Sequence, residues 1–232
     1  MEASKEITNL SHKLSKFLRH QMGKTKDFPF SPNGYCLVQD LLVLPNFAKY
    51  TFEHISRAVA LDAKTRYDLR QGLPYPGGVC QQGVHSFTDT QNTSEECNCW
   101  WIRANQGHSF KLLDPDLEPL LNSDTFKNVI HGTYLVCWEK IVKSGGLKTM
   151  NRTHIHFSFG LPGEDGVISG MRKSSEVFIY IDLEAALRDG IKFFKSKNNV
   201  ILSPGIEGKG VIPLKYFFKV TDRSGRTLLS AD

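Results

Sequence analysis

The stretch HGTYLVCWEKIVKSGGLKTMNRTHIHFS, from His131 to Ser158, predicts the architecture of the C-terminal half of this 232-residue chain. Its pattern indicates a strand, a helix, a turn at the glycine pair and a second strand. Because side chains alternate along a strand, four polar residues of the last segment should share one face. These are Arg152, His154, His156 and Ser158. Cationic and polar groups on one face favour a polar ligand, and a phosphate-rich nucleotide fits best.

The overall composition is that of an ordinary globular protein with a mild basic bias. The net charge is +5, the pI about 8.9 and the hydrophobic content 40%. This charge suits an anionic substrate but falls short of the bias of a dedicated nucleic-acid coat protein. The length allows one large domain or two small lobes.

The cysteines and the N-terminus favour a cytoplasmic or nuclear location. Five cysteines are an odd number, which favours reduced thiols over a disulfide framework. The N-terminal sequence MEASKEITNL is charged and has no apolar core, so no secretory signal is expected. No apolar run approaches the roughly 18 to 20 residues that a membrane span needs.

The first 110 residues are expected to form a small lobe of winged-helix type. Apolar residues recur at helical spacing over 4–21, and Thr51 is a plausible N-cap for a second helix that ends near Ala60. A strand that begins near Arg66 should pair with the segment that begins at Trp100. Residues 71–99 lie between these strands, contain no Lys or Arg, and are expected to form a surface insertion.

The remainder is expected to be a linker followed by a second lobe. Residues 111–128 are acidic and interrupted by proline, which predicts a linker. Residues 129–232 contain a buried strand over Val177–Ile181, a short helix ended by Gly190 and several further short strands. Many strands with few helices predict an α+β fold.

Four polar patches are candidates for phosphate binding. They are Arg19-His20, Lys64 with Arg66, the run Arg103-Ala-Asn105-Gln106-Gly107-His108-Ser109, and the opening stretch. Arginine suits phosphate because its planar fork donates to two oxygens at once, and a glycine lets backbone N–H groups approach an anion.

Each patch also has a structural interpretation. Arg19-His20 could cap a helix and face water, and Lys64 with Arg66 could be solvated hairpin charges. Residues 105–107 could form only a turn, and His154 and His156 could be half-buried strand residues satisfied by carbonyl groups. A zinc site at Cys97-x-Cys99 with His85 is a further alternative, but a second ligand pair is missing, so we expect no metal.

Taken in order, the motifs resemble the NAD-dependent tRNA 2′-phosphotransferases over nearly the whole chain. The matching segments are Leu14-Ser-Lys-x-Leu-Arg19-His20, Asp62-x-Lys64-x-Arg66-Tyr67, Ile102-Arg-Ala-Asn-Gln-Gly-His-Ser109, His131-Gly-Thr133, Gly146-Leu147, Arg152-x-His154-Ile-His156-Phe-Ser158 and Asn199-Val-Ile-Leu-Ser-Pro-Gly205. Two departures stand out. Tyr67 stands where the family often has Phe. The 71–99 insertion interrupts a hairpin that is usually short, and an insertion folded across the RNA face would affect the access of RNA.

The resemblance implies an N-terminal winged-helix-like lobe that binds RNA and a C-terminal ADP-ribosyltransferase-like lobe that binds NAD. It implies a catalytic set of Arg19, His20, Arg66 and Arg152 around one phosphate. His131, Gly132 and Thr133 would line the nicotinamide riboside site, flanked by His156 and Ser158. Lys64, from the candidate patches, and the loop of Arg103, Asn105, Gln106, Gly107, His108 and Ser109 would contact RNA or phosphate.

The implied reaction removes an internal RNA 2′-phosphate, as left at a tRNA splice junction, with NAD as co-substrate and no metal. The products would be ADP-ribose 1″,2″-cyclic phosphate, nicotinamide and RNA with a free 2′-hydroxyl. We expect a monomer with no membrane partner. Two other hypotheses stay open. One is an inactive RNA-binding module, and the other is ADP-ribosylation of nucleic-acid phosphate ends by the same cleft.

Overall fold

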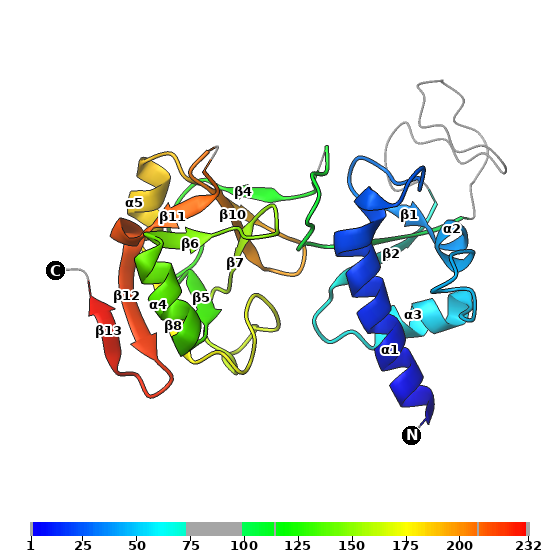
Figure 1. Cartoon of the computed structure of the whole chain (residues 1–232), viewed down its shortest axis with the longest axis horizontal. Coiled ribbons are helices and arrows are strands. Elements are labelled where there is room, and N and C mark those ends of the chain that lie inside the picture. The colour runs from blue at the N-terminus through cyan, green and yellow to red at the C-terminus, as the bar shows by residue number, and fades with distance from the viewer. Residues whose placement is uncertain (1, 73–98, 114, 208, 231–232) are drawn as a thin grey trace. The chain divides into compact units, whose positions relative to one another are not determined.

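The computed structural model describes residues 2–72, 99–113, 115–207 and 209–230, so most of the predicted insertion lies outside the described residues. The chain divides into two compact units, Met1–Pro115 and Asp116–Asp232, which are described here one at a time. Short helices and several small sheets give an α+β fold, as the sequence predicted. Figure 1 shows these elements along the chain.

The helices of unit 1 bury the apolar face that the sequence predicted. They are α1 (Glu2–Lys16), the π-helix η1 (Phe17–Gln21), the 3-10 helix η2 (Met22–Lys24), α2 (Val38–Leu42) and α3 (Phe52–Ala60). Leu10, Leu14 and Leu18 are fully buried, and α1 packs against α3 (Figure 1). Thr51 is the N-cap of α3, and its N–H donates to His54 Nδ1 at 3.2 Å.

A three-stranded antiparallel sheet completes unit 1. Its strands, in the spatial order β1-β3-β2, are β1 (Cys36–Leu37), β3 (Trp100–Ala104) and β2 (Tyr67–Gln71). Tyr67 pairs with Ala104, which confirms the predicted hairpin across the insertion. The hairpin therefore brings the residue before β2, Arg66, beside the residue after β3, Asn105, whose N–H donates to the Arg66 carbonyl at 2.8 Å.

Unit 2 is built from two four-stranded sheets and one two-stranded sheet. The first has the order β13 (Thr227–Ser230), β12 (Phe217–Asp222), β8 (Val177–Ile181) and β5 (Ile130–Thr133). The second has the order β4 (Glu118–Leu120), β9 (Lys192–Lys195), β10 (Ile201–Gly205) and β7 (Ile155–Phe157). The third pairs β11 (Val211–Pro213) with β6 (Gly146–Lys148).

One core joins the two larger sheets of unit 2. Ile130 bridges Ser158 by backbone hydrogen bonds in both directions at 2.8 Å, which ties β5 to the end of β7. Ile179, Ile201 and Phe157 are fully buried in this core. The remaining helical elements of the unit are α4 (Leu135–Lys143), α5 (Leu183–Arg188) and the 3-10 helix η3 (Leu214–Tyr216).

Two local features differ from the sequence-based expectation. The segment 111–128, expected as a linker, supplies β4, whose residue Pro119 pairs with Phe194 of β9. The strand expected over 152–158 is only Ile155–Phe157, because the chain turns before it: Arg152 N–H donates to the Thr149 carbonyl at 3.1 Å, and Met150 has φ of 55°. Arg152 therefore does not share a strand face with His156.

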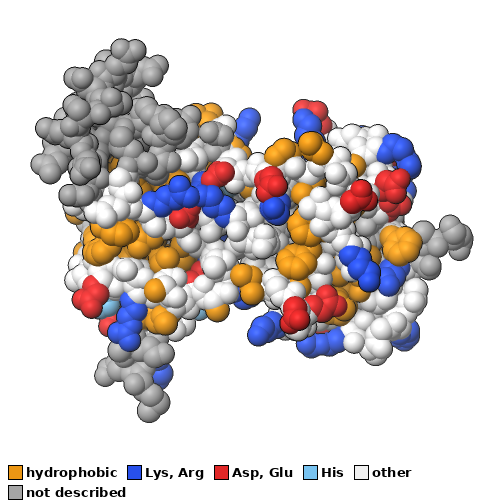
Figure 2. Space-filling view, turned by 180° about the vertical axis from the view of Figure 1, so that it is seen from behind, with side chains coloured by type: hydrophobic (Ala, Val, Ile, Leu, Met, Phe, Trp, Pro, Cys, Tyr) orange, Lys and Arg blue, Asp and Glu red, His pale blue; other side chains and the backbone are white. Residues whose placement is uncertain are grey.

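Charged side chains of both signs are mixed on the surface seen in Figure 2, and the described helices are short or polar. Over the face seen in Figure 2, basic and acidic side chains lie among one another and do not form one continuous basic surface. Among the helices of the described residues, none is both long and apolar enough to cross a membrane.

Candidate active site

The Arg19-His20 pair lies on a π-helix that directly continues α1. The Met22 N–H donates to the Phe17 carbonyl, which is the five-residue spacing of a π-turn, and such turns occur frequently at functional sites. Both side chains are half-buried, whereas Phe17 and Leu18 anchor the turn in the core. The widened turn thus presents a cationic pair on a rigid support.

The loop after β3 packs against this pair. The Ser109 N–H donates to the Arg19 carbonyl at 2.8 Å. Gly107 has φ of 88°, and a Cβ there would lie 3.4 Å from Arg19 Cδ and Nε. Glycine at 107 therefore serves both a left-handed turn and the close approach of the arginine side chain. The loop of 103–109 and Arg19 thus form one structure within unit 1.

Arg66 is held by the tight turn that precedes β2. The buried carboxylate of Asp62 accepts hydrogen bonds from the Arg66 backbone N–H and guanidinium, and from Lys64 N–H at 3.3 Å. The Asp62 side chain is 1% exposed and that of Arg66 is 31% exposed. Thr65 completes the turn with φ of 43°, and its carbonyl accepts from Asn105 Nδ2 at 2.8 Å. Asp62 therefore fixes the orientation of Arg66.

The structure brings Arg19 and Arg66 to the same residue, Tyr67. Burial raises the pKa of Tyr67, its hydrogen bond with Ser11 lowers it, and the charges of Arg19 and Arg66 lower it as well. The Tyr67 hydroxyl donates to the Ser11 carbonyl at 2.5 Å. The loop of 103–109 also contacts both arginines, since Ser109 N–H donates to the Arg19 carbonyl and Asn105 N–H donates to the Arg66 carbonyl.

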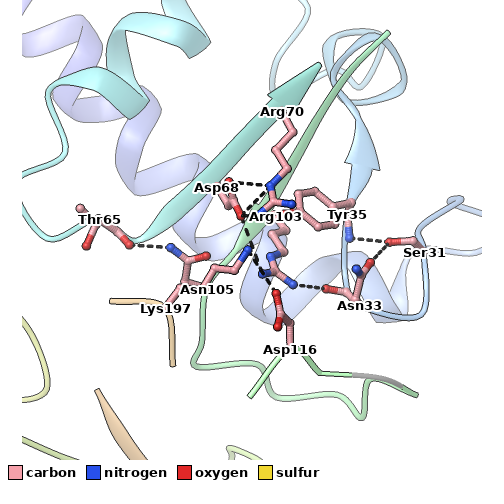
Figure 3. A network of polar contacts seen from close by, with 10 residues as sticks. All are labelled: Ser31, Asn33, Tyr35, Thr65, Asp68, Arg70, Arg103, Asn105, Asp116 and Lys197. Carbon is pink, nitrogen blue, oxygen red and sulfur yellow. Dashed lines mark hydrogen bonds and ion pairs between the residues drawn. The ribbon is translucent and has the colours of Figure 1, made fainter. Parts of the chain in front are cut away.

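Arg103 belongs to a buried polar network, which Figure 3 shows. Its side chain is 4% exposed and its guanidinium lies 4.6 Å from the ring centroid of Tyr35. Arg103 donates to the Asn33 carbonyl at 3.2 Å, and the Tyr35 hydroxyl donates to Asp68 Oδ2 at 2.7 Å. Arg70 stacks over the same ring at 5.8 Å and donates to Asp68 at 3.1 Å. This network ties the hairpin to the turn before β1.

The rest of the 103–109 loop is also largely buried. Gln106 is 7% exposed and His108 is 8% exposed, and the His108 ring contacts the Phe110 ring edge-on at 5.4 Å. Asn105 and Ser109 are half-buried. The loop is therefore a packed element of unit 1 and not a solvated turn.

In unit 2, the strand β5 places His131, Gly132 and Thr133 in succession. His131 Nδ1 lies 2.9 Å from the His156 carbonyl oxygen. Burial lowers the pKa of His131, the His156 carbonyl raises it, and the nearby charge of Arg152 lowers it further. His131 is therefore neutral near pH 7. The charge of Arg152 contributes to keeping it neutral.

Glycines let a loop lie tightly over this strand. A Cβ on Gly132 would lie 2.7 Å from Ser175 Oγ and 2.9 Å from Met171 Cβ. Gly170, with φ of 104°, lies against the end of β7, where a Cβ would lie 2.9 Å from Ser158 Cα. The loop of 159–176 therefore covers β5 and Ser158 closely, and Ser158 is fully buried.

Arg152 and His154 follow the turn before β7. Arg152 is exposed, yet its pKa is lowered, by partial burial first and by the charge of Arg172 second. Burial also lowers the pKa of His154, whose ring contacts Phe194 edge-on at 6.1 Å. His156 Nδ1 lies 3.0 Å from the His154 carbonyl oxygen. Unit 2 thus gathers His131, Arg152 and Arg172 in one neighbourhood.

Sequence reasoning missed three residues that support these groups. Asp62 and Asp68 were not among the candidate site residues, and Arg172 was not singled out. The spacing of Asp62 to Arg66 across a turn was a signal that could have been used, because Asp side chains accept hydrogen bonds from the backbone a few residues on. Nothing local to Arg172 distinguishes it from a solvated lysine or arginine.

The described residues include three of the cysteines and part of the predicted metal alternative. His85 and Cys97 lie outside the described residues, whereas Cys36 and Cys137 are free thiols. Within the described ranges, no group of three His, Cys, Asp or Glu residues is placed to hold a metal ion.

Comparison with known proteins identifies the class of enzyme. Residues 5–205 match the family model described as RNA 2′-phosphotransferase, Tpt1 / KptA family. The chain is 39% identical to tRNA 2′-phosphotransferase 1 of Bos taurus, over 90% of this chain and 72% of the relative. It is 37% identical to that of Danio rerio, over 93% and 85%, and 35% identical to tRNA 2′-phosphotransferase of Saccharomyces cerevisiae, over 89% and 82%.

The chain therefore belongs to the RNA 2′-phosphotransferase family, as the sequence motifs predicted. The members of this family are transferases that remove a 2′-phosphate from RNA, and they use NAD as co-substrate.

Proposed function

We propose that this protein transfers the internal 2′-phosphate of spliced tRNA to NAD, giving ADP-ribose 1″,2″-cyclic phosphate, nicotinamide and RNA with a 2′-hydroxyl. The observation that carries the proposal is that one loop, 103–109, contacts both Arg19 and Arg66 in unit 1. A phosphate dianion is the ligand that two neighbouring guanidinium groups bind best. Family membership supports the identity of both substrates.

In this proposal unit 1 is a winged-helix-like RNA-binding lobe and unit 2 an ADP-ribosyltransferase-like lobe. The three α-helices α1, α2 and α3 and a small antiparallel sheet support the first assignment. Arg19, His20 and Arg66 bind the 2′-phosphate, with Lys64 and the 103–109 loop beside them. The burial of Arg103 supports a positioning role for that residue, because its donors already serve Asn33 and Asp68.

Unit 2 supplies the site for NAD through His131, Gly132, Thr133 and His156, while the fully buried Ser158 holds β5 beside β7 through its backbone bridge to Ile130. Close packing of the loop over Gly132 supports this assignment, because a cover on the strand excludes water from the reacting ribose. A neutral His131 adds no further positive charge beside Arg152. Arg152 supplies a guanidinium of unit 2 for phosphate binding in this proposal.

The proposed reaction has two steps. An oxygen of the RNA 2′-phosphate attacks C1″ of the nicotinamide ribose, and the C–N bond breaks with neutral nicotinamide as leaving group. The ribose 2″-hydroxyl then attacks phosphorus and gives its proton to solvent, the bond from phosphorus to the RNA 2′-oxygen breaks, and that oxygen takes up a proton from His20. Because charge builds on the phosphoryl oxygens, preorganised arginines stabilise the transition state.

The test is NAD-dependent loss of 2′-phosphate from a synthetic oligonucleotide, followed with release of nicotinamide. Arg66→Ala and Arg152→Ala should each slow the reaction on the order of 10² or more, as the loss of one oxyanion donor does elsewhere. Arg57→Ala on α3 and Arg188→Ala on α5 are matched exposed controls, and both should react at the wild-type rate. Wild-type protein that consumes no NAD would contradict the proposal.

Product analysis separates the remaining alternatives. An inactive RNA-binding module would bind RNA with a steep dependence on salt and release no nicotinamide. ADP-ribosylation of nucleic-acid ends would release nicotinamide and leave ADP-ribose attached to the RNA. The proposed reaction instead yields unmodified 2′-hydroxyl RNA and a free cyclic phosphate.

A further inference from the structure

The segment just after Gly170 places an unassigned arginine beside the strand of His131 to Thr133. Met171 and Ser175 both lie within van der Waals range of Gly132, and the Glu176 N–H donates to the Thr133 carbonyl at 2.8 Å. Arg172 follows Met171 directly. The backbone of this segment is therefore fixed on β5, which restricts where the Arg172 side chain can reach.

Neutral groups orient the Arg172 guanidinium. Its NH1 donates to the Tyr134 hydroxyl at 3.5 Å, and its Cζ lies 5.9 Å from the centroid of the Tyr134 ring. The Tyr134 hydroxyl lies 2.9 Å from Ser174 Oγ, which holds the phenol in turn. A hydroxyl partner positions a guanidinium without forming an ion pair with it.

The local charge balance calls for an anion. Arg152 lies near enough for the charge of Arg172 to act on it. Within the part of the chain that the structure describes, neither arginine forms an ion pair with a carboxylate. Glu176, whose charge acts on Tyr134, accepts the Leu135 N–H at 3.0 Å and so serves the first turn of α4. An anion bound between these two exposed cations would relieve their mutual repulsion, which water otherwise screens.

We propose that Arg172, oriented by Tyr134, binds the diphosphate of the dinucleotide co-substrate, beside the phosphate that Arg152 binds. The assignment rests on the proposed function, and it names the group that fixes the co-substrate on unit 2. A diphosphate suits the position because the same segment covers Gly132, where the nicotinamide riboside lies in the proposed site. Arginine donates to two phosphate oxygens through one planar fork, whereas lysine acts as a point charge without that fixed geometry.

The central experiment measures steady-state kinetics with NAD and 2′-phosphorylated RNA varied separately. Arg172→Ala should raise the KM for NAD about 10-fold or more, the effect of one charged hydrogen bond. The kcat and the KM for RNA should stay within about threefold of wild type. Arg172→Lys should give an intermediate KM, and Tyr134→Phe should give a smaller increase because only the orientation of Arg172 is lost. Lys173→Ala, an adjacent exposed cation, is the control and should change nothing.

A binding measurement identifies the chemical group and does not depend on turnover. ADP carries the diphosphate and AMP does not. ADP binding measured by calorimetry should weaken at least 10-fold in Arg172→Ala, whereas AMP binding should weaken much less. Circular dichroism and the melting temperature verify that each variant is folded.

The outcomes separate this inference from the proposed function. An unchanged NAD KM together with unchanged ADP binding would overturn the role of Arg172. A rise in the KM for RNA alone would overturn it too, and would assign Arg172 to the RNA. Wild-type protein that binds ADP but transfers no phosphate would contradict the proposed function and leave the diphosphate site standing.

Discussion

Asp62 offers the sharpest test of how the arginines are positioned, through the variant Asp62→Asn. The Asp62 carboxylate is 1% exposed and accepts from two backbone N–H groups and the Arg66 guanidinium. Hydrogen bonds to a charged group contribute about 1.5–3 kcal/mol each. Arg66 is about one-third exposed, so its ion pair is partly screened and contributes at the low end. Asparagine keeps one acceptor oxygen for the turn but loses the charge.

We expect Asp62→Asn to lower the free energy of unfolding by about 2 kcal/mol, which is roughly a 30-fold shift in the folding equilibrium. With Arg66 no longer held, the transfer rate at saturating substrates should fall about 10- to 100-fold, the usual effect of a small misplacement of a reacting group. Urea unfolding followed by tryptophan fluorescence reports the first quantity, since Trp101 lies on β3, which pairs with the strand that follows the turn. A single-turnover assay reports the second.

The chain contains a matched control for this variant. Asp222 accepts the Ser224 and Arg226 N–H groups at 2.9 and 3.0 Å, and Arg226 Nε at 3.0 Å, so it repeats the Asp62–Arg66 turn in unit 2. Asp222→Asn should destabilise the protein less, because Arg226 is 72% exposed, and should keep the wild-type rate. A folded Asp62→Asn protein that reacts as fast as wild type, or faster, would refute the reasoning. It would mean that Asp62 competes with phosphate for Arg66.

Three further predictions follow from the same structure. Gly132→Ala should raise the KM for NAD at least tenfold, because a Cβ there would lie 2.7 Å from Ser175 Oγ; a folded variant with unchanged KM would contradict the close cover of β5. Tyr67→Phe removes a buried hydroxyl that donates to the Ser11 carbonyl and should lower the free energy of unfolding by about 1 kcal/mol in thermal melts, while wild-type stability would show that this bond contributes nothing. The lowered pKa of His131 and His154 means that the unfolded chain binds more protons than the folded one as the pH falls through about 6.5. Stability should therefore be full above pH 7 and decrease towards pH 5, and His131→Gln should flatten that slope in denaturation measured across the range.

Local patterns in the sequence predicted the elements that carry the site. The helical spacing of Leu10, Leu14 and Leu18 predicted the buried face of α1, and the strands β2, β3, β5 and β8 lie where the apolar runs placed them. These features depend on the backbone periods of 3.6 and 2 residues, which are properties of neighbouring residues and are therefore visible in the chain itself.

Other features depended on contacts between residues far apart in the chain. The π-turn at Arg19-His20 is braced by Ser109, and the orientation of Arg103 depends on Tyr35 and Asn33, so neither could be predicted from local pattern. The alternation over 152–158 predicted a longer strand than the observed β7. The strand is shorter because backbone hydrogen bonds of Thr149, one of them with Gly210, hold the preceding residues in a turn.

The amino-acid sequence by itself determined the order of helices and strands and the family to which the chain belongs, since motifs and local periodicity can be read from the order of residues. Only the tertiary structure decided which charged groups are compensated and which are not. Arg66 has the carboxylate of Asp62 as its partner, whereas the Arg172 guanidinium contacts the hydroxyl and the ring of Tyr134. The physical reason is that the interaction energy of two charges depends on their separation in space and on their burial, and a sequence states neither.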